Sequence, residues 1–445
     1  MKLRVAAAAL LLAAFAAAQD AAVQARGDAF VVTVHGGDEA LARRTLAVVE
    51  PVWPQVARLF GVDGAPPQLL PVHLYRTRAA YTAADQRLTG GRFGPNQAMT
   101  HWGSRSAHVA LQPSCSDAHL VEFGLPLQTE VMLLWEAVHV VRLHLCDNFR
   151  KHPGWFLDGL AATTAQRVFH ELHPGLGPQP FFTQRWLRTK ALLDDERLPS
   201  LDELLRDDTG DLQMRDRYAA RVAWFEFVGS EPDFDLGALA RAVRDADGAA
   251  AMRKAALEAF AGREAAFRER VHAFAPEWNE RERSLWLLGD VWRQHAFPGV
   301  NAVALRREPI DGGAFVARGA LWVMPGDKTQ LNFLFAADQD GFYSLAMVAG
   351  VGCTLFEHRY DGNQWQRHEA FATRQLRAGA ETKFELRGEG SKLTVTIGTA
   401  TAELTLPRPL PERIVWGVGA QCGGAGGGDG TVGEWRGVTV TAPAR

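Results

Sequence analysis

The stretch LWEAVHVVRLHLCDNFRKHPGWFLDGLA, residues 134–161, decides how the first half of this chain is interpreted. Apolar residues recur at helical spacing and predict one helix over residues 127–145 and a second over residues 155–167. Residues four apart on a helix lie on one face, so Trp135 and His139 project to the same side. The first helix therefore presents an indole and an imidazole together to whatever lies opposite.

The segment WEAVH differs at one position from H-E-x-x-H, in which two histidines four residues apart hold zinc and the glutamate activates water. Trp135 and His139 occupy the two histidine positions, and Glu136 occupies that of the general base. Eighteen residues then separate His139 from Asp158, which lies in PGWFLDGLA. The chain thus resembles the gluzincin metallopeptidases, in particular the exported bacterial peptidase-MA-like group, whose third ligand is a glutamate at this spacing in P-x-W-x-x-E-G-L-A.

Carried across residue by residue, this resemblance implies that the metal-ligand positions fall on Trp135, His139 and Asp158, and the base on Glu136. Tyr218 would stand near the oxyanion position. An indole N–H only donates, so Trp135 offers zinc no lone pair. The Asp158 carboxylate sits one methylene closer to the backbone than that of glutamate. Because zinc sites use three protein ligands or more, we predict a degraded site in a fold that kept no metal chemistry.

The same residues leave an alternative open, a divergent active metallopeptidase with an altered ligand set and zinc as its cofactor. His152 precedes the second helix and remains a candidate substitute ligand, whereas His144 is five residues beyond His139 and points away from it. If the site is inactive, no cofactor is expected and Trp135 fills the former cleft. Glu136 would then pair with His139, three residues further along the helix.

The predicted fold class of this first part is α+β, a mixed sheet followed by helices, as the resemblance also implies over residues 28–278. Residues 39–61 have helical spacing, interrupted at Pro51 and Pro54, and this part of the chain also contains three β-rich runs. They are residues 30–35, 69–75 and 106–113. Further helices are expected at residues 201–205, 218–228 and 236–274, the last with one break near Gly248.

The pattern changes near residue 283, after which short alternating runs are separated by glycine-rich turns. KFELRGEGSKLTVTIG, residues 383–398, is such a hairpin, and the whole region predicts an all-β sandwich. SLWLLGDVW, YDGNQWQRH, LTVTIGTATAEL and EWRGVTVTA make residues 284–445 resemble concanavalin-like, laminin-G-type jelly rolls. The resemblance implies binding of carbohydrate or of an extracellular protein, with Trp365 a candidate to stack on sugar rings. Asp338 and Asp340 in DQDG form either a calcium site or, more simply, a turn.

The first 18 residues have a basic start, an apolar run and small residues, and predict a cleaved secretory signal. The expected domains are therefore a signal at 1–18, a peptidase-like domain at 19–283 and the sandwich at 284–445. The protein is expected to be secreted or periplasmic, with no membrane span after cleavage. A formal net charge of -3 gives no electrostatic reason to expect nucleic acid as a partner.

Export permits disulfides, and the four cysteines fall into two distant pairs. The simplest pairing joins Cys115 to Cys146 and Cys353 to Cys422, one bridge in each domain. Free buried cysteines are the competing interpretation. Together these patterns predict a secreted protein with a non-catalytic binding or scaffolding role. The rivals are an active divergent metallopeptidase and a glycan-binding module in which the sandwich alone carries the function.

Overall fold

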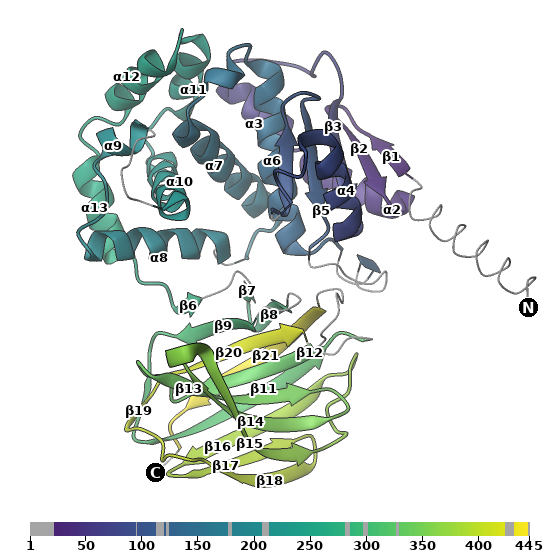
Figure 1. The fold of residues 1–445 in the computed structure, drawn as a ribbon, viewed down its shortest axis with the longest axis vertical. Coiled ribbons are helices and arrows are strands. Elements are labelled where there is room, and N and C mark those ends of the chain that lie inside the picture. Colours follow the sequence, from purple (N-terminus) through teal and green to yellow (C-terminus); the bar gives the residue numbers. More distant parts are fainter. Residues whose placement is uncertain are drawn as a thin grey trace, which may run out of the picture. The chain divides into compact units, whose positions relative to one another are not determined.

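The computed structural model divides the chain into two compact units. The N-terminal unit lies within Met1–Pro174 and Arg185–Phe274, and the C-terminal unit within Gly175–Gln184 and Ala275–Arg445 (Figure 1). The structure describes residues 22–94, 96–112, 120–121, 124–176, 180–206, 213–280, 285–296, 301–325, 329–422 and 431–443. The expected signal segment, Cys115 and the glycine-rich stretch 423–430 lie outside these residues.

A five-stranded mixed sheet forms the first part of the N-terminal unit, with the strand order β1-β2-β3-β5-β4. The three central strands run parallel, and each of the two edge strands is antiparallel to its neighbour. The predicted strands are confirmed as β2, β3 and β5, whereas the short edge strands β1 and β4 were not predicted. The strands are β1 (Ala22–Arg26), β2 (Phe30–His35), β3 (Leu70–Tyr75), β4 (Ala98–His101) and β5 (Ser106–Ala110).

Helices make up the remainder of this unit (Figure 1). The predictions for residues 127–145 and 201–205 match α6 and α9 at both ends, while the run at 236–274 forms three helices, α11 to α13. α4 and α8 were not predicted. The helices are α2 (Glu39–Val49), α3 (Val52–Leu59), α4 (Arg78–Thr89), α6 (Leu127–Leu145), α7 (Gly154–Leu172), α8 (Pro180–Asp194), α9 (Leu201–Leu205), α10 (Met214–Ser230), α11 (Leu236–Asp245), α12 (Ala249–Ala259) and α13 (Glu264–Ala273).

Helix α6 is central to the unit because it is apolar on nearly all sides and is buried accordingly. It packs against β4 and β5 of the sheet and against α7, and α7 packs in turn against α10. Gly159 lets the last two helices approach closely, since a Cβ atom there would lie 2.1 Å from the ring of Phe225. The glycine of the D-G-L-A segment is therefore explained by helix packing.

The C-terminal unit is the predicted all-β sandwich. Two seven-stranded antiparallel sheets have the orders β18-β17-β16-β11-β21-β8-β7 and β15-β14-β13-β12-β20-β9-β6, and β10 pairs separately with β19. The strands are β6 (Trp278–Glu280), β7 (Leu285–Leu288), β8 (Val291–Ala296), β9 (Asn301–Arg306), β10 (Ile310–Asp311), β11 (Ala314–Val323), β12 (Thr329–Phe335), β13 (Gly341–Val348), β14 (Gly352–Arg359), β15 (Gln364–Ala372), β16 (Thr382–Glu389), β17 (Lys392–Ile397), β18 (Ala400–Thr405), β19 (Arg413–Ile414), β20 (Trp416–Cys422) and β21 (Thr431–Thr441).

One buried cluster, which includes Phe333, Leu386 and Val395, fills the space between the sheets. The hairpin predicted at residues 383–398 is confirmed as β16 and β17. The sandwich begins with β6, which pairs with β9 and lies before the boundary at residue 284 that the change in sequence pattern suggested.

The predicted disulfides are contradicted, because Cys146 and Cys353 are both free, buried thiols. Cys353 on β14 and Cys422 on β20 are separated by β13 and β12 in the sheet order. Three strand spacings amount to about 14 Å, whereas a disulfide needs Cα atoms within about 7 Å. Burial also raises the pKa of each free thiol, Cys146 and Cys353, to about 12. Within the described residues, no helix is long and apolar enough to cross a membrane.

Candidate functional site

A buried arginine packs against the face of α6 that includes Trp135. Trp135 is 8% exposed, and the guanidinium of Arg185 from α8 lies 4.9 Å from the centre of its ring. The same guanidinium lies 5.3 Å from the ring of Tyr218 on α10 and donates a hydrogen bond of 3.2 Å to its hydroxyl. Cation–π contacts with two rings stabilise a buried arginine that has left water. Arg185 therefore fills the space beside Trp135.

Glu226, also on α10, supplies the negative charge for this cluster. Its Oε1 lies 3.5 Å from a guanidinium nitrogen of Arg185, and its Oε2 accepts a hydrogen bond of 3.0 Å from the indole of Trp186. Burial raises the pKa of Glu226 to about 7, although Arg185 and the indole both favour the ionised form. We call Trp135, Arg185, Tyr218 and Glu226 the arginine cluster. Sequence reasoning found Trp135 and Tyr218 but missed the two charged members, which no local pattern marks.

Glu136, in the position of the general base, does not pair with His139 as expected. Its carboxylate accepts a hydrogen bond from the hydroxyl of Thr100 on β4. The expectation was wrong because β4, an edge strand of four residues, was not predicted, and it lies against α6. Burial raises the pKa of Glu136 to about 7, and the Thr100 hydrogen bond opposes that shift.

The residual ligand positions, His139 and Asp158, are both partly buried. His139 lies beside Trp135, with a ring-to-ring distance of 6.0 Å, and Asp158 lies just beyond the first turn of α7. Burial lowers the pKa of His139 to about 3, helped by the charge of Arg142, so its imidazole is neutral. No group of three or more His, Cys, Asp or Glu side chains among the described residues is arranged to hold a metal ion. These residues do not fit zinc.

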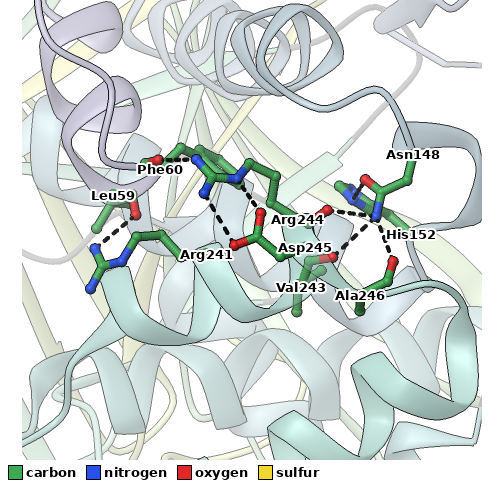
Figure 2. Close-up of polar contacts among 9 residues, drawn as sticks. All are labelled: Leu59, Phe60, Asn148, His152, Arg241, Val243, Arg244, Asp245 and Ala246. Atoms are coloured by element: carbon green, nitrogen blue, oxygen red, sulfur yellow. Dashed lines mark hydrogen bonds and ion pairs between the residues drawn. The ribbon is translucent and has the colours of Figure 1, made fainter.

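His152, the candidate substitute ligand, has both ring nitrogens engaged. Nδ1 accepts a hydrogen bond of 3.0 Å from Arg142, and Nε2 lies 2.9 Å from the side-chain oxygen of Asn148 (Figure 2). The amide nitrogen of Asn148 in turn donates to three carbonyls at the end of α11, as Figure 2 shows. Arg241 and Arg244 of α11 donate to the carbonyls of Leu59 and Phe60. His152 is therefore part of a structural contact that holds the segment between α6 and α7 against the end of α11, while the two arginines hold α11 against the end of α3.

The C-terminal unit presents a second candidate site on the outward side of β13, β14 and β15. Trp365 is 41% exposed, and three aromatic rings contact it. The centre of His358 lies 4.3 Å away, that of Phe342 5.8 Å and that of Phe356 6.2 Å. His358 is held in place by Asn363, whose side-chain oxygen lies 2.9 Å from Nε2. We call this surface the Trp365 platform.

Arg367 extends the platform. It lies two residues after Trp365 on β15, so the two side chains share a face, and it pairs across the strands with Phe356. Both Trp365 and Arg367 are exposed. A flat ring beside a set of N–H donors can hold a ligand that has one apolar face and several hydroxyl groups.

The possible calcium site in DQDG is a turn. The side chain of Asp338 accepts hydrogen bonds of 2.8 and 2.9 Å from the backbone N–H groups of Asp340 and Gly341. Aspartate commonly closes a turn by this contact with its own backbone. The DQDG segment therefore forms the turn that the sequence suggested.

Comparisons with known proteins add a limited likeness. No protein-family model matches the chain, and no curated protein matches it. Among solved structures it is similar to the carbohydrate-binding module CBM66 from Bacillus subtilis, with 12% identity over 37% of this chain and 96% of that one and a TM-score of 0.29. Sheep galectin-11 in complex with glycerol is 10% identical over 30% of this chain and 94% of its own, with a TM-score of 0.24. Galectin-Ib of Xenopus laevis is 13% identical over 32% of this chain and 99% of its own, and its TM-score is also 0.24. At such scores these likenesses decide neither fold nor function, and the sandwich rests on its strand pairing.

Proposed function

We propose that this protein is a non-catalytic saccharide-binding protein of the extracellular or periplasmic space, and that its C-terminal unit holds the ligand. The observation that carries the proposal is the Trp365 platform, where an indole is supported by three rings yet remains 41% exposed. A ring fixed in place loses little conformational freedom on binding, which favours affinity. Arg367 adds donors for the hydroxyl groups of a sugar.

The N-terminal unit, in this proposal, is a gluzincin-like domain that has kept its scaffold without its metal chemistry. Three observations support this. The indole of Trp135 cannot ligate a metal, a guanidinium already lies over its ring, and His152 is committed to Arg142 and Asn148. With a fixed cation beside Trp135 and no metal ion at these positions, Glu136 has no metal-bound water to activate.

Binding experiments with two tryptophan variants test the saccharide proposal. A broad glycan array selects a ligand for the full-length protein, and calorimetry then measures its affinity for Trp365→Ala and for Trp102→Ala. Trp102 is the matched control because it is 42% exposed but lies in the N-terminal unit. We expect Trp365→Ala to weaken binding at least tenfold, about 1.4 kcal/mol, and Trp102→Ala to leave it unchanged. An array with no binding, or equal losses in both variants, contradicts the proposal.

One observation favours the alternative of a divergent metallopeptidase. Burial raises the pKa of Glu136 to about 7, the range in which a carboxylate serves as a general base at neutral pH. Metal analysis of the purified full-length protein separates the two functions. Stoichiometric zinc that is lost in His139→Ala supports the peptidase, and its absence from the wild type supports the binding protein.

A further inference from the structure

A hollow of about 480 Å³ crosses the outward side of the first sheet of the sandwich, away from the Trp365 platform on the second. It spans the adjacent strands β17, β16, β11 and β21, a width of about 14 Å at three strand spacings. Lys383 lines it from β16, where the neighbouring Phe384 points into the core. We call this hollow the basic groove.

The backbone creates the groove. The register between β11 and β21 shifts between Arg318 and Ala320, so Gly319 stands at a bulge, and Gly437 opposite has φ +54°. A Cβ atom at Gly319 would lie 2.9 Å from the side chain of Val438. The close approach of Val438 favours glycine at 319, and the positive φ favours glycine at 437. Bulges of this kind commonly adjoin functional sites because they redirect the side chains around them.

Cations dominate the lining. Arg318, Lys383 and Arg436 line the groove together with one carboxylate, that of Glu385. Glu385 is shared, because it pairs with Arg318 at 2.6 Å and with Arg387 at 2.5 Å. No ion pair of Lys383 is found among the described residues, and the Lys383 side chain is exposed to solvent. A concave surface with excess charge of one sign concentrates ligands of the opposite sign.

Arg436 is held in position by the strand beneath it. It contacts Glu434 at 2.6 Å and Glu381 at 3.1 Å, and its guanidinium lies 5.7 Å from the ring of Trp322. Glu434 is buried and also pairs with Arg293 at 2.8 Å. The Arg436 cation is therefore fixed at the edge of the groove, whereas the exposed side chains of Lys383 and Arg318 can adjust to a ligand.

We infer that the basic groove is a second binding site, which takes an acidic saccharide that carries carboxylate or sulfate groups. Guanidinium and ammonium groups bind both kinds of anion through charge-assisted hydrogen bonds. The glycine-lined floor admits a flat chain, and the Thr396 hydroxyl on the rim can bond its hydroxyl groups. The inference rests on the proposed saccharide-binding function for the sugar part of the ligand, but it involves different residues on the opposite sheet.

The test measures the affinity of the full-length protein for an oligogalacturonate, a sulfated galactan oligosaccharide and neutral cellohexaose. We expect the wild type to bind at least one of the two acidic probes, more weakly as salt concentration rises. The double variant Arg318→Ala with Lys383→Ala should lose at least tenfold in affinity. Arg413→Ala, which removes an exposed cation on β19 outside the groove, should change affinity less than twofold. The two acidic probes also decide which anion the groove prefers.

A second pair of variants blocks the groove without changing charge. Thr394 and Thr396 are both partly buried on the outward side of β17, but only Thr396 lines the hollow. Thr396→Phe should therefore weaken acidic-probe binding at least tenfold, and Thr394→Phe should leave it unchanged. Phenylalanine is well accepted in strands, so both variants should fold.

The outcomes separate this inference from the proposed function. Binding of an acidic probe that is lost in the Arg318→Ala, Lys383→Ala double variant and in Thr396→Phe, but kept in Trp365→Ala, supports the groove. This holds whether or not cellohexaose binds. Acidic-probe binding that is lost in Trp365→Ala and kept in both groove variants overturns the inference of a second site in the groove. The platform would then remain as the binding site. Equal binding of a DNA duplex, or equal weakening by Arg413→Ala, reduces the effect to non-specific charge and also overturns the inference.

Discussion

Trp135 and Trp365 lie in different units, and both contact a histidine and further aromatic rings. Trp135 is 8% exposed, and its ring is covered by the guanidinium of Arg185, which Tyr218 and Glu226 hold in place. Trp365 is 41% exposed, although His358, Phe342 and Phe356 contact its ring. The ring of Trp135 is buried against partners within the protein, whereas part of the Trp365 ring remains exposed to solvent and is available to a ligand.

This difference shows that the surroundings of a tryptophan decide whether its ring is available to a ligand. A buried charge needs a partner, and the arginine cluster supplies one for each of its members. Such a cluster stabilises the scaffold but leaves nothing for a ligand to contact. A ring on the surface stabilises the fold little and is available for binding. The following predictions test that contrast.

The largest expected effect is zinc binding by the N-terminal unit after two substitutions. Trp135→His with Asp158→Glu provides three ligands at the spacing of the gluzincin pattern and removes the ring on which Arg185 stacks. We expect wild-type protein without stoichiometric zinc and a double variant that binds zinc with a dissociation constant of about 1 μM or lower, a binding free energy of about −8 kcal/mol. Equilibrium dialysis with metal analysis measures it. A folded double variant without zinc would count against the ligand assignment.

Breaking the arginine cluster should cost the next largest amount. Arg185→Leu leaves the buried Glu226 without its cation, and removal of one partner of a buried ion pair costs about 3–5 kcal/mol. Urea denaturation measures the free energy of unfolding. The adjacent control Arg188→Leu removes a more exposed arginine paired with Asp216 and should cost about 1 kcal/mol or less. Equal losses would show that the cluster has no special role.

Acid should weaken the sheet of the N-terminal unit through buried histidines. Burial and neighbouring cations lower the pKa of His73 to about 4 and that of His108 to about 3. The unfolded chain takes up protons below about pH 6.5 while the native state does not, so stability is lost as the pH falls. Each such histidine adds a slope of up to about 1.4 kcal/mol per pH unit. Hydrogen exchange of β3 and β5 between pH 7 and 5 measures this loss of stability, with β16 and β17 as the reference strands. The variant His108→Gln should reduce the slope of stability against pH. An unchanged slope would refute the assignment.

The smallest effect is expected from reductant. Because Cys146 and Cys353 are free and buried, dithiothreitol should leave the unfolding midpoint of both units unchanged. Alkylation should label these two thiols only after denaturation, since burial raises the pKa of each to about 12 and thiolates are the reactive form. Peptide mapping without reductant checks this. Either cysteine found in a disulfide would contradict the structure.

Periodicity predicted α6 and the β16–β17 hairpin well, but it missed the helices α4 and α8. The ends of α6 and of the β16–β17 hairpin follow from the apolar pattern, because a helix or hairpin depends on residues close by in sequence. The edge strands β1 and β4 were missed because runs of four or five residues carry little pattern. That omission also hid Thr100, the hydrogen-bond partner of Glu136. The even number of cysteines suggested bridges, but sheet order separates Cys353 from Cys422 by two strands.

The sequence by itself determined that the chain has an α+β part and a sandwich, that Trp135 and His139 share one face of a helix, and that Trp365 was a candidate for the surface. Only the tertiary structure decided that Arg185 covers Trp135, that His152 is engaged by Arg142 and Asn148, and that four strands form a basic groove. Local patterns reflect interactions between residues a few positions apart. The partners of a buried charge, and the charges that share a hollow, come from segments far apart in sequence, and folding alone brings them together.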